Sequence, residues 1–317
     1  MTDKWKLAIK IMISIALVIY AISRADLLAA ARLLPDARWL PLIAMLALNF
    51  LSRLLSAYRW YRLVKPVQPE LRYLPFVKIT LSSSFYGQFL PGGGVETLQI
   101  LGLASKHSKI STATASVFAD RALGLITTSL FLIVGLSLTH QLDGPNLLPL
   151  AVLACAALSL VLLLLVNRDV RTLLFRILPR RVRSGLIPWL DAKLMYFDTF
   201  RERPRFLLDS ALLAALMQIL RIFLFYFGAV SLVDSVPLMV LFLAVPTILF
   251  LLVLPISVGG IGVRESTLVF FFAMYGLDES VALALAILVY AGNIIVASPG
   301  AWFGLQLFRQ RAPRMRE

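Results

Sequence analysis

The sequence predicts an all-α integral membrane protein with about six full transmembrane helices and two opposed segments that are broken by glycine. Apolar residues make up 60% of the chain and charged residues 15%. The mean hydropathy of +0.86 is far above that of soluble proteins. Apolar runs of about 20 residues, enough to cross about 30 Å of hydrocarbon, recur along the chain. We therefore expect residues 1–317 to form a single polytopic membrane domain.

Six apolar stretches are expected to cross the bilayer completely. They lie at about 6–23, 39–60, 112–138, 147–166, 206–230 and 281–307. The first follows a basic start and precedes no small-residue cleavage site, so we expect a retained span. Cys155 is the only cysteine, which excludes an intrachain disulfide. His107 and His140 have no acidic cluster near them, so we expect no metal and no other cofactor.

Two further apolar segments, 71–105 and 237–277, are each interrupted by a glycine-rich break. The first break includes Pro91 to Gly94, and the second includes Gly259 to Gly262. Hydrocarbon tolerates an open backbone only where it is buried in protein or lines a cavity. We therefore expect each segment to be a re-entrant hairpin or a tight pair of short spans, and each break to mark a site.

The distribution of Lys and Arg predicts the topology. Segment 167–205 carries ten basic and four acidic residues, which is typical of a cytoplasmic loop. Counting spans from this loop places both termini in the cytoplasm, Arg59 near the cytoplasmic face, and the two breaks on paths that enter from opposite sides. The basic region 24–38 would then lie outside, where we expect an amphipathic helix on the membrane surface. Opposed breaks are typical of transporters with a midplane site.

Basic residues in the loops account for the net charge of +14. The sequence contains no nucleic-acid-binding motif, so we expect no nucleic-acid partner.

Ionisable side chains within the spans indicate a polar interior, because each costs about 2.5–3.5 kcal/mol at the centre of a lipid-exposed helix. Asn49 and Arg53 are four residues apart and share a helical face. Gln218 and Arg221 are three apart and do the same. Both pairs are expected to point into the helix bundle.

Asp120 and Arg121 are adjacent, so their side chains diverge by about 100° on a helix and each needs another partner. We expect Glu96 to meet Arg121 or Arg221. We expect Asp120 to meet Arg264. Structural ion pairs between the broken segments are the alternative to a binding site.

The number of these charges favours a ligand over anchoring alone. Guanidinium groups suit phosphate, as do glycine amides next to a helix N-terminus, so a phospholipid headgroup is the expected ligand. The arginines would bind phosphate, and the acids would balance them or hold a cationic headgroup. The predicted substrate-binding residues are Arg53, Gly92, Gly93, Glu96, Asp120, Arg121, Arg221, Gly259, Gly260, Arg264 and Glu265. No catalytic residue is expected.

Three ordered motifs carry a resemblance to a known family. They are Gly87 to Gly94, Asp120 to Gly124, and Pro255 to Glu265. Together they resemble the flippase-like membrane domain of lysylphosphatidylglycerol synthases, over residues from about 5 to 308. The resemblance implies a bacterial or archaeal cytoplasmic-membrane protein that moves a lipid between leaflets, without naming the lipid. The expected lipid partner is an anionic or aminoacylated phospholipid. Glu96 stands where the family usually has Asp, and the Arg that usually follows is missing.

The soluble aminoacyl-transferase domain of the fused family members is absent, so no enzymatic activity is expected. The expected function is movement of a phospholipid or related headgroup through a polar intramembrane cavity. The alternatives are a secondary transporter of a small amphipathic solute and a non-transporting accessory protein of a lipid-synthesis or glycosyltransferase enzyme. A membrane-embedded lipid-modifying enzyme ranks third among these rivals. The candidate partners besides lipid are a lipid-synthesis enzyme and a second copy of the chain.

Overall fold

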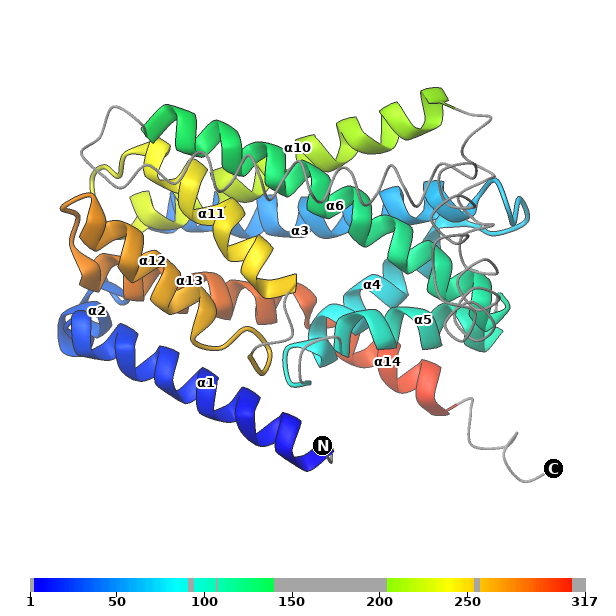
Figure 1. Cartoon of the computed structure of the whole chain (residues 1–317), viewed down its shortest axis with the longest axis horizontal. Coiled ribbons are helices and arrows are strands. Elements are labelled where there is room, and N and C mark those ends of the chain that lie inside the picture. The colour runs from blue at the N-terminus through cyan, green and yellow to red at the C-terminus, as the bar shows by residue number, and fades with distance from the viewer. Residues whose placement is uncertain (1–2, 91–93, 107, 140–203, 254–256, 310–317) are drawn as a thin grey trace, which may run out of the picture.

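A computed structural model describes residues 3–90, 94–106, 108–139, 204–253 and 257–309. The regular elements of these ranges are helices (Figure 1). They are α1 (Asp3–Arg24), α2 (Leu27–Leu33), α3 (Trp39–Val64), α4 (Tyr73–Gly87), α5 (Gly94–Lys106), α6 (Ile110–Thr139), α10 (Pro204–Leu232), α11 (Leu238–Val253), α12 (Val263–Met274), α13 (Glu279–Ala297) and α14 (Pro299–Arg309). The predicted span 147–166, nearly all of the basic segment 167–205, Cys155, His107 and His140 lie outside the described residues.

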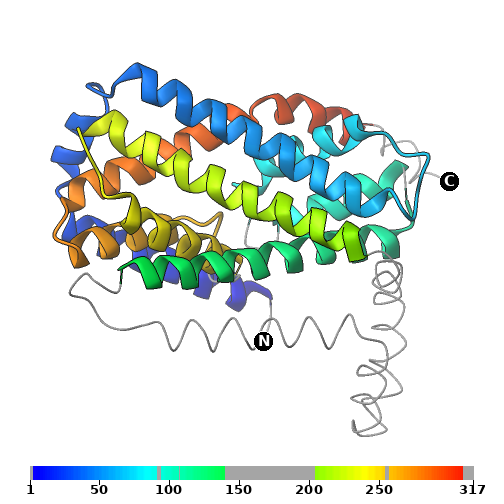
Figure 2. The ribbon, with the colours of Figure 1, turned by 90° about the horizontal axis from the view of Figure 1, so that it is seen from above.

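Four described helices are long and apolar enough to cross a membrane. They are Trp39–Val64, Ile110–Leu138, Leu208–Leu232 and Glu279–Ala297. α1 and α2 add a fifth if the pair, bent by 82°, counts as one span. The long helices α3, α6 and α10 pack against one another, and both views show them running side by side (Figures 1 and 2). An all-α membrane fold is therefore confirmed, with four or five candidate spans in the described part.

The last predicted span, 281–307, is divided in two. α13 ends at Ala297 and α14 begins at Pro299. Proline has no N–H to continue the helical hydrogen bonds, and it is favoured as the first residue of a new helix. A Cβ atom on Gly300 would overlap the carbonyl of Leu81, so the start of α14 lies directly against α4.

Both broken segments form pairs of short helices. α4 packs on α5, and α11 packs on α12. At 1.5 Å per residue these four arms are about 18–24 Å long, which is less than the roughly 30 Å of hydrocarbon. In Figure 1 the end of α4 and the residues just before α12 lie near each other in the middle of the molecule, and Gly259 packs against the Gln88 carbonyl. Entry of the two pairs from opposite sides of the membrane stays a prediction.

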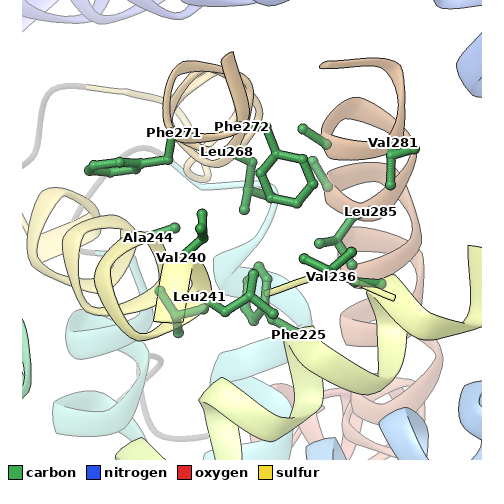
Figure 3. Close-up of a cluster of buried hydrophobic side chains, with 14 of the residues drawn as sticks. Phe225, Val236, Val240, Leu241, Ala244, Leu268, Phe271, Phe272, Val281 and Leu285 are labelled. Atoms are coloured by element: carbon green, nitrogen blue, oxygen red, sulfur yellow. The ribbon is translucent and has the colours of Figure 1, made fainter. Parts of the chain in front are cut away.

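Each hairpin has its own apolar core. The larger core joins α11 and α12 to α10 and α13, and Figure 3 shows Leu241, Phe272 and Leu285 within it. The smaller core joins α4 and α5 to the ends of α3 and α6, where the rings of Trp60 and Phe76 pack edge to face with centroids 4.9 Å apart. The two apolar cores are separate. The parts of the long helices that lie between the cores can therefore carry polar side chains.

Region 24–38 was expected to lie outside, although its arginines conflict with the positive-inside rule. Two of these arginines have acidic partners. Arg24 forms an ion pair with Glu279 at 3.1 Å, and Arg38 forms one with Asp234 at 3.1 Å. Between them, α2 forms the short helix that the sequence predicted for this region. These ion pairs neutralise two of the three arginines of the region.

Candidate functional site

The second glycine-rich break lies against the backbone at the end of α4. Gly259 has a φ of +60°, and a Cβ atom there would overlap the carbonyl oxygen of Gln88 at the end of α4. Gly260 has a φ of +79°, which also favours glycine. α1 supports this turn, because the backbone N–H of Val258 donates to Ser14 Oγ at 3.0 Å. Gly92 and Gly93 of the first break lie outside the described residues.

Arg53, near the middle of α3, joins the first hairpin to α13. Its Nη1 donates to Ser84 Oγ of α4 at 2.8 Å, and its Nη2 donates to Asn293 Oδ1 of α13 at 2.8 Å. Asn49 Nδ2 donates to the same oxygen at 3.1 Å. The predicted shared face of Asn49 and Arg53 is confirmed. All of these partners are neutral, so they orient the guanidinium group without cancelling its charge.

The predicted meeting of Glu96 with an arginine is confirmed, and the partner is Arg121. Arg121 Nε lies 3.0 Å from Glu96 Oε1, outside hydrogen-bonding direction, so the contact is an ion pair. The two side chains remain 37% and 36% exposed. Arg121 Nη2 also donates to Gln99 Oε1 of α5 at 3.5 Å. This pair therefore remains partly accessible from outside the protein.

The prediction that Asp120 meets Arg264 is wrong, because Asp120 pairs with Arg59. Arg59 Nε donates to Asp120 Oδ1 at 2.7 Å, and the side chains are only 7% and 8% exposed. Arg59 is therefore buried between helices, whereas the sequence placed it near the cytoplasmic face. Adjacent residues diverge on a helix, so α6 directs Asp120 toward α3 and Arg121 toward α5.

Arg264 lies in the first turn of α12 and is 8% exposed. Its guanidinium carbon is 5.6 Å from the ring centroid of Tyr290, a cation–π distance. Its Nη1 is buried and has no hydrogen-bond partner among the described residues. The neighbouring Glu265 caps the helix instead, because its Oε2 accepts from the N–H of Gly262 at 2.8 Å. Arg264 thus retains donor capacity inside the protein.

Arg221 of α10 completes the set. Its Nη1 donates to Gln218 Oε1 at 3.2 Å, and Gln218 Nε2 donates to Thr128 Oγ1 of α6 at 2.9 Å. The predicted common face of Gln218 and Arg221 is confirmed by these contacts. As with Arg53, the partners of this guanidinium group are neutral.

The arginines form one electrostatic cluster. Arg53 is repelled by Arg264 and Arg121. Arg221 is repelled by Arg59, Arg53 and Arg121, and is attracted by Asp120. No described carboxylate lies within 4.0 Å of the guanidinium groups of Arg53, Arg221 or Arg264. The structure therefore brings the predicted cations together, and most of them lack a close counter-charge.

Sequence reasoning missed several residues of this cluster. Asn293 and Tyr290 lie in the apolar helix α13, and Arg59 lies in an aromatic run of α3. An amide within an apolar helix is the signal that identified Asn49, and the same test finds Asn293. The described residues contain no group of three His, Cys, Asp or Glu side chains that could hold a metal ion.

These features define a multi-pass, all-helical membrane protein with an arginine-rich polar cluster at the meeting point of two opposed, glycine-broken helix pairs. The chain belongs to the family described as the lysylphosphatidylglycerol synthase TM region, whose sequence profile matches residues 7–299. The resemblance that the three motifs suggested is therefore confirmed. A comparison with curated proteins gives no match.

Proposed function

We propose that this protein moves a phospholipid headgroup between the two leaflets of a membrane. The observation that carries the proposal is the clustering of Arg53, Arg121, Arg221 and Arg264 where the hairpins meet. Buried guanidinium groups without close counter-charges are costly in a membrane interior, and phosphate is the anion whose geometry they match. A lipid brings that phosphate while its acyl chains stay in the bilayer.

The two ion pairs of the cluster suit different roles. The Arg59–Asp120 pair is buried and short, so it holds α3 against α6. The Glu96–Arg121 pair is about one-third exposed, and such pairs contribute only about 0–1 kcal/mol. A headgroup phosphate can therefore replace Glu96 on Arg121 at low cost. We infer that Arg121 receives the headgroup and that Arg53 and Arg264 hold it deeper in the protein.

A scrambling assay tests this proposal. The purified protein is reconstituted into phosphatidylcholine vesicles with trace fluorescent phosphatidylglycerol, phosphatidylethanolamine or lysylphosphatidylglycerol, and movement between leaflets is followed by chemical quenching. We expect Arg53→Gln and Arg121→Ala to slow movement at least about tenfold, the effect of losing one charge-assisted contact. Arg32→Gln, on the exposed face of α2, is the matched control and should keep the wild-type rate.

Three outcomes would contradict the proposal. The folded wild type moving none of these lipids would favour an accessory protein. Equal rates in the wild type and both cluster variants would mean that lipid crosses by another path. Uptake of a small amphipathic solute into vesicles, without lipid movement, would favour a secondary transporter.

A further inference from the structure

The arginine cluster carries more positive than negative charge. Five arginines and three carboxylates lie in the described cluster, an excess of two positive charges. They are Arg53, Arg59, Arg121, Arg221 and Arg264, with Glu96, Asp120 and Glu265. Arg59 and Asp120 cancel each other, as do Arg121 and Glu96. Glu265 is the neighbour of Arg264 and interacts with it electrostatically.

The excess falls on Arg53 and Arg221, which repel each other. Among the described residues, the hydrogen-bond partners of both are neutral: Ser84 and Asn293 for Arg53, and Gln218 for Arg221. Neutral partners satisfy donors but do not cancel charge. Two such charges at membrane depth require a counter-ion, because the interior screens them poorly.

A second observation points to the position of that counter-ion. Arg264 Nη1 is buried and has no hydrogen-bond acceptor among the described residues. Arg264 also lies in the first turn of α12, where helix N–H groups favour an anion. An orphaned buried guanidinium nitrogen costs free energy unless an acceptor reaches it. A phosphate oxygen is an acceptor of the required charge.

We propose that the site selects a lipid whose headgroup carries two negative charges, such as a phosphate monoester or a diphosphate. This inference rests on the proposed lipid transport and specifies its substrate class. A phosphate monoester carries about −1.5 to −2 at pH 7, which matches the excess of the cluster. A phosphodiester lipid carries only one negative charge. A lysyl ester of phosphatidylglycerol is net positive, because its two amino groups outweigh one phosphate, so the cluster disfavours it.

The test compares transport rates of lipids that differ in headgroup charge. Wild-type protein in phosphatidylcholine vesicles is given trace fluorescent phosphatidic acid, phosphatidylglycerol or lysylphosphatidylglycerol, all with the same labelled acyl chain. We expect phosphatidic acid to move about tenfold faster than phosphatidylglycerol, which corresponds to one extra charge-assisted contact. Lysylphosphatidylglycerol should be the slowest.

Two variants with opposite effects on the charge provide the control. Arg221→Gln removes one of the two excess charges, so the ratio of phosphatidic acid to phosphatidylglycerol rates should fall about tenfold. Glu96→Gln adds one positive charge, so the same ratio should rise. Damage to the fold would slow both lipids and would not shift the ratio in opposite directions.

The outcomes separate this inference from the proposed function. If lipids move but the ratio is near one, or the lysyl lipid is the fastest, the dianion inference is wrong and lipid transport stands. If no lipid moves, the proposed function fails. Uptake of labelled inorganic phosphate into the same vesicles, without lipid movement, would support a dianion site and overturn lipid as its source.

Discussion

The buried ion pair between Arg59 and Asp120 allows a quantitative prediction for the free energy of unfolding. Arg59 Nε lies 2.7 Å from Asp120 Oδ1, and both side chains are less than one-tenth exposed. Removing one partner of such a pair leaves a buried, uncompensated charge and costs about 3–5 kcal/mol. We expect this cost for Arg59→Met and for Asp120→Leu. The double variant leaves no buried charge, so it should be destabilised less than either single variant.

The measurement is reversible unfolding of the four proteins in mixed micelles of mild detergent and dodecyl sulfate. The Glu96–Arg121 pair, about one-third exposed, provides the comparison, because Glu96→Gln should change the free energy of unfolding by less than about 1 kcal/mol. If the cost of the double variant equals the sum of the single costs, Arg59 and Asp120 are not coupled. The assignment of this pair as the anchor between α3 and α6 would then be refuted.

Three further predictions concern the breaks and the site. Gly259→Ala should reduce both transport and thermal stability, because the new Cβ overlaps the Gln88 carbonyl. Gly276→Ala is the control: its φ of +66° is similar but the space around it is open, so it measures the backbone cost alone, about 1–2 kcal/mol. Tyr290→Leu should lower transport about twofold to thirtyfold by removing the cation–π contact with Arg264, worth about 0.5–2 kcal/mol, while Tyr290→Phe should retain it. Selectivity for a phosphate monoester should fall as the pH is lowered from about 7.5 to about 5.5, because the second pKa of the monoester lies near 6. A ratio of phosphatidic acid to phosphatidylglycerol rates that does not change with pH would contradict the dianion inference.

The arrangement of the broken helices could be predicted from the sequence because proline and glycine act locally. The first arm ends at Gly87 and the next begins at Gly94, and Gly259 and Gly260, both at positive φ, lie between the arms of the second pair. The ion pair of Glu96 with an arginine could also be predicted, because few partners were available to Glu96. An unpaired carboxylate beside the first break needs a cation from a neighbouring helix.

Partners that depend on helix rotation could not be predicted. Arg59 lies between Tyr58 and Trp60, and aromatic residues beside a cation are typical of a membrane interface. The packing of α3 on α6 directs Arg59 toward Asp120. Arg264 instead contacts the ring of Tyr290. Nothing in the local sequence distinguishes the two possible partners of Asp120.

No arm of either hairpin is long enough to cross the hydrocarbon by itself. Under the proposed function, the two hairpins therefore seal the bilayer in series, each over part of its thickness, and Gly259 of the second lies against the Gln88 carbonyl of the first. In that proposed cycle, movement of one hairpin opens the centre to one side while the other hairpin keeps the opposite side sealed. We expect headgroups to cross without a continuous water-filled pore, so that lipid movement is not accompanied by leakage of protons or sodium ions.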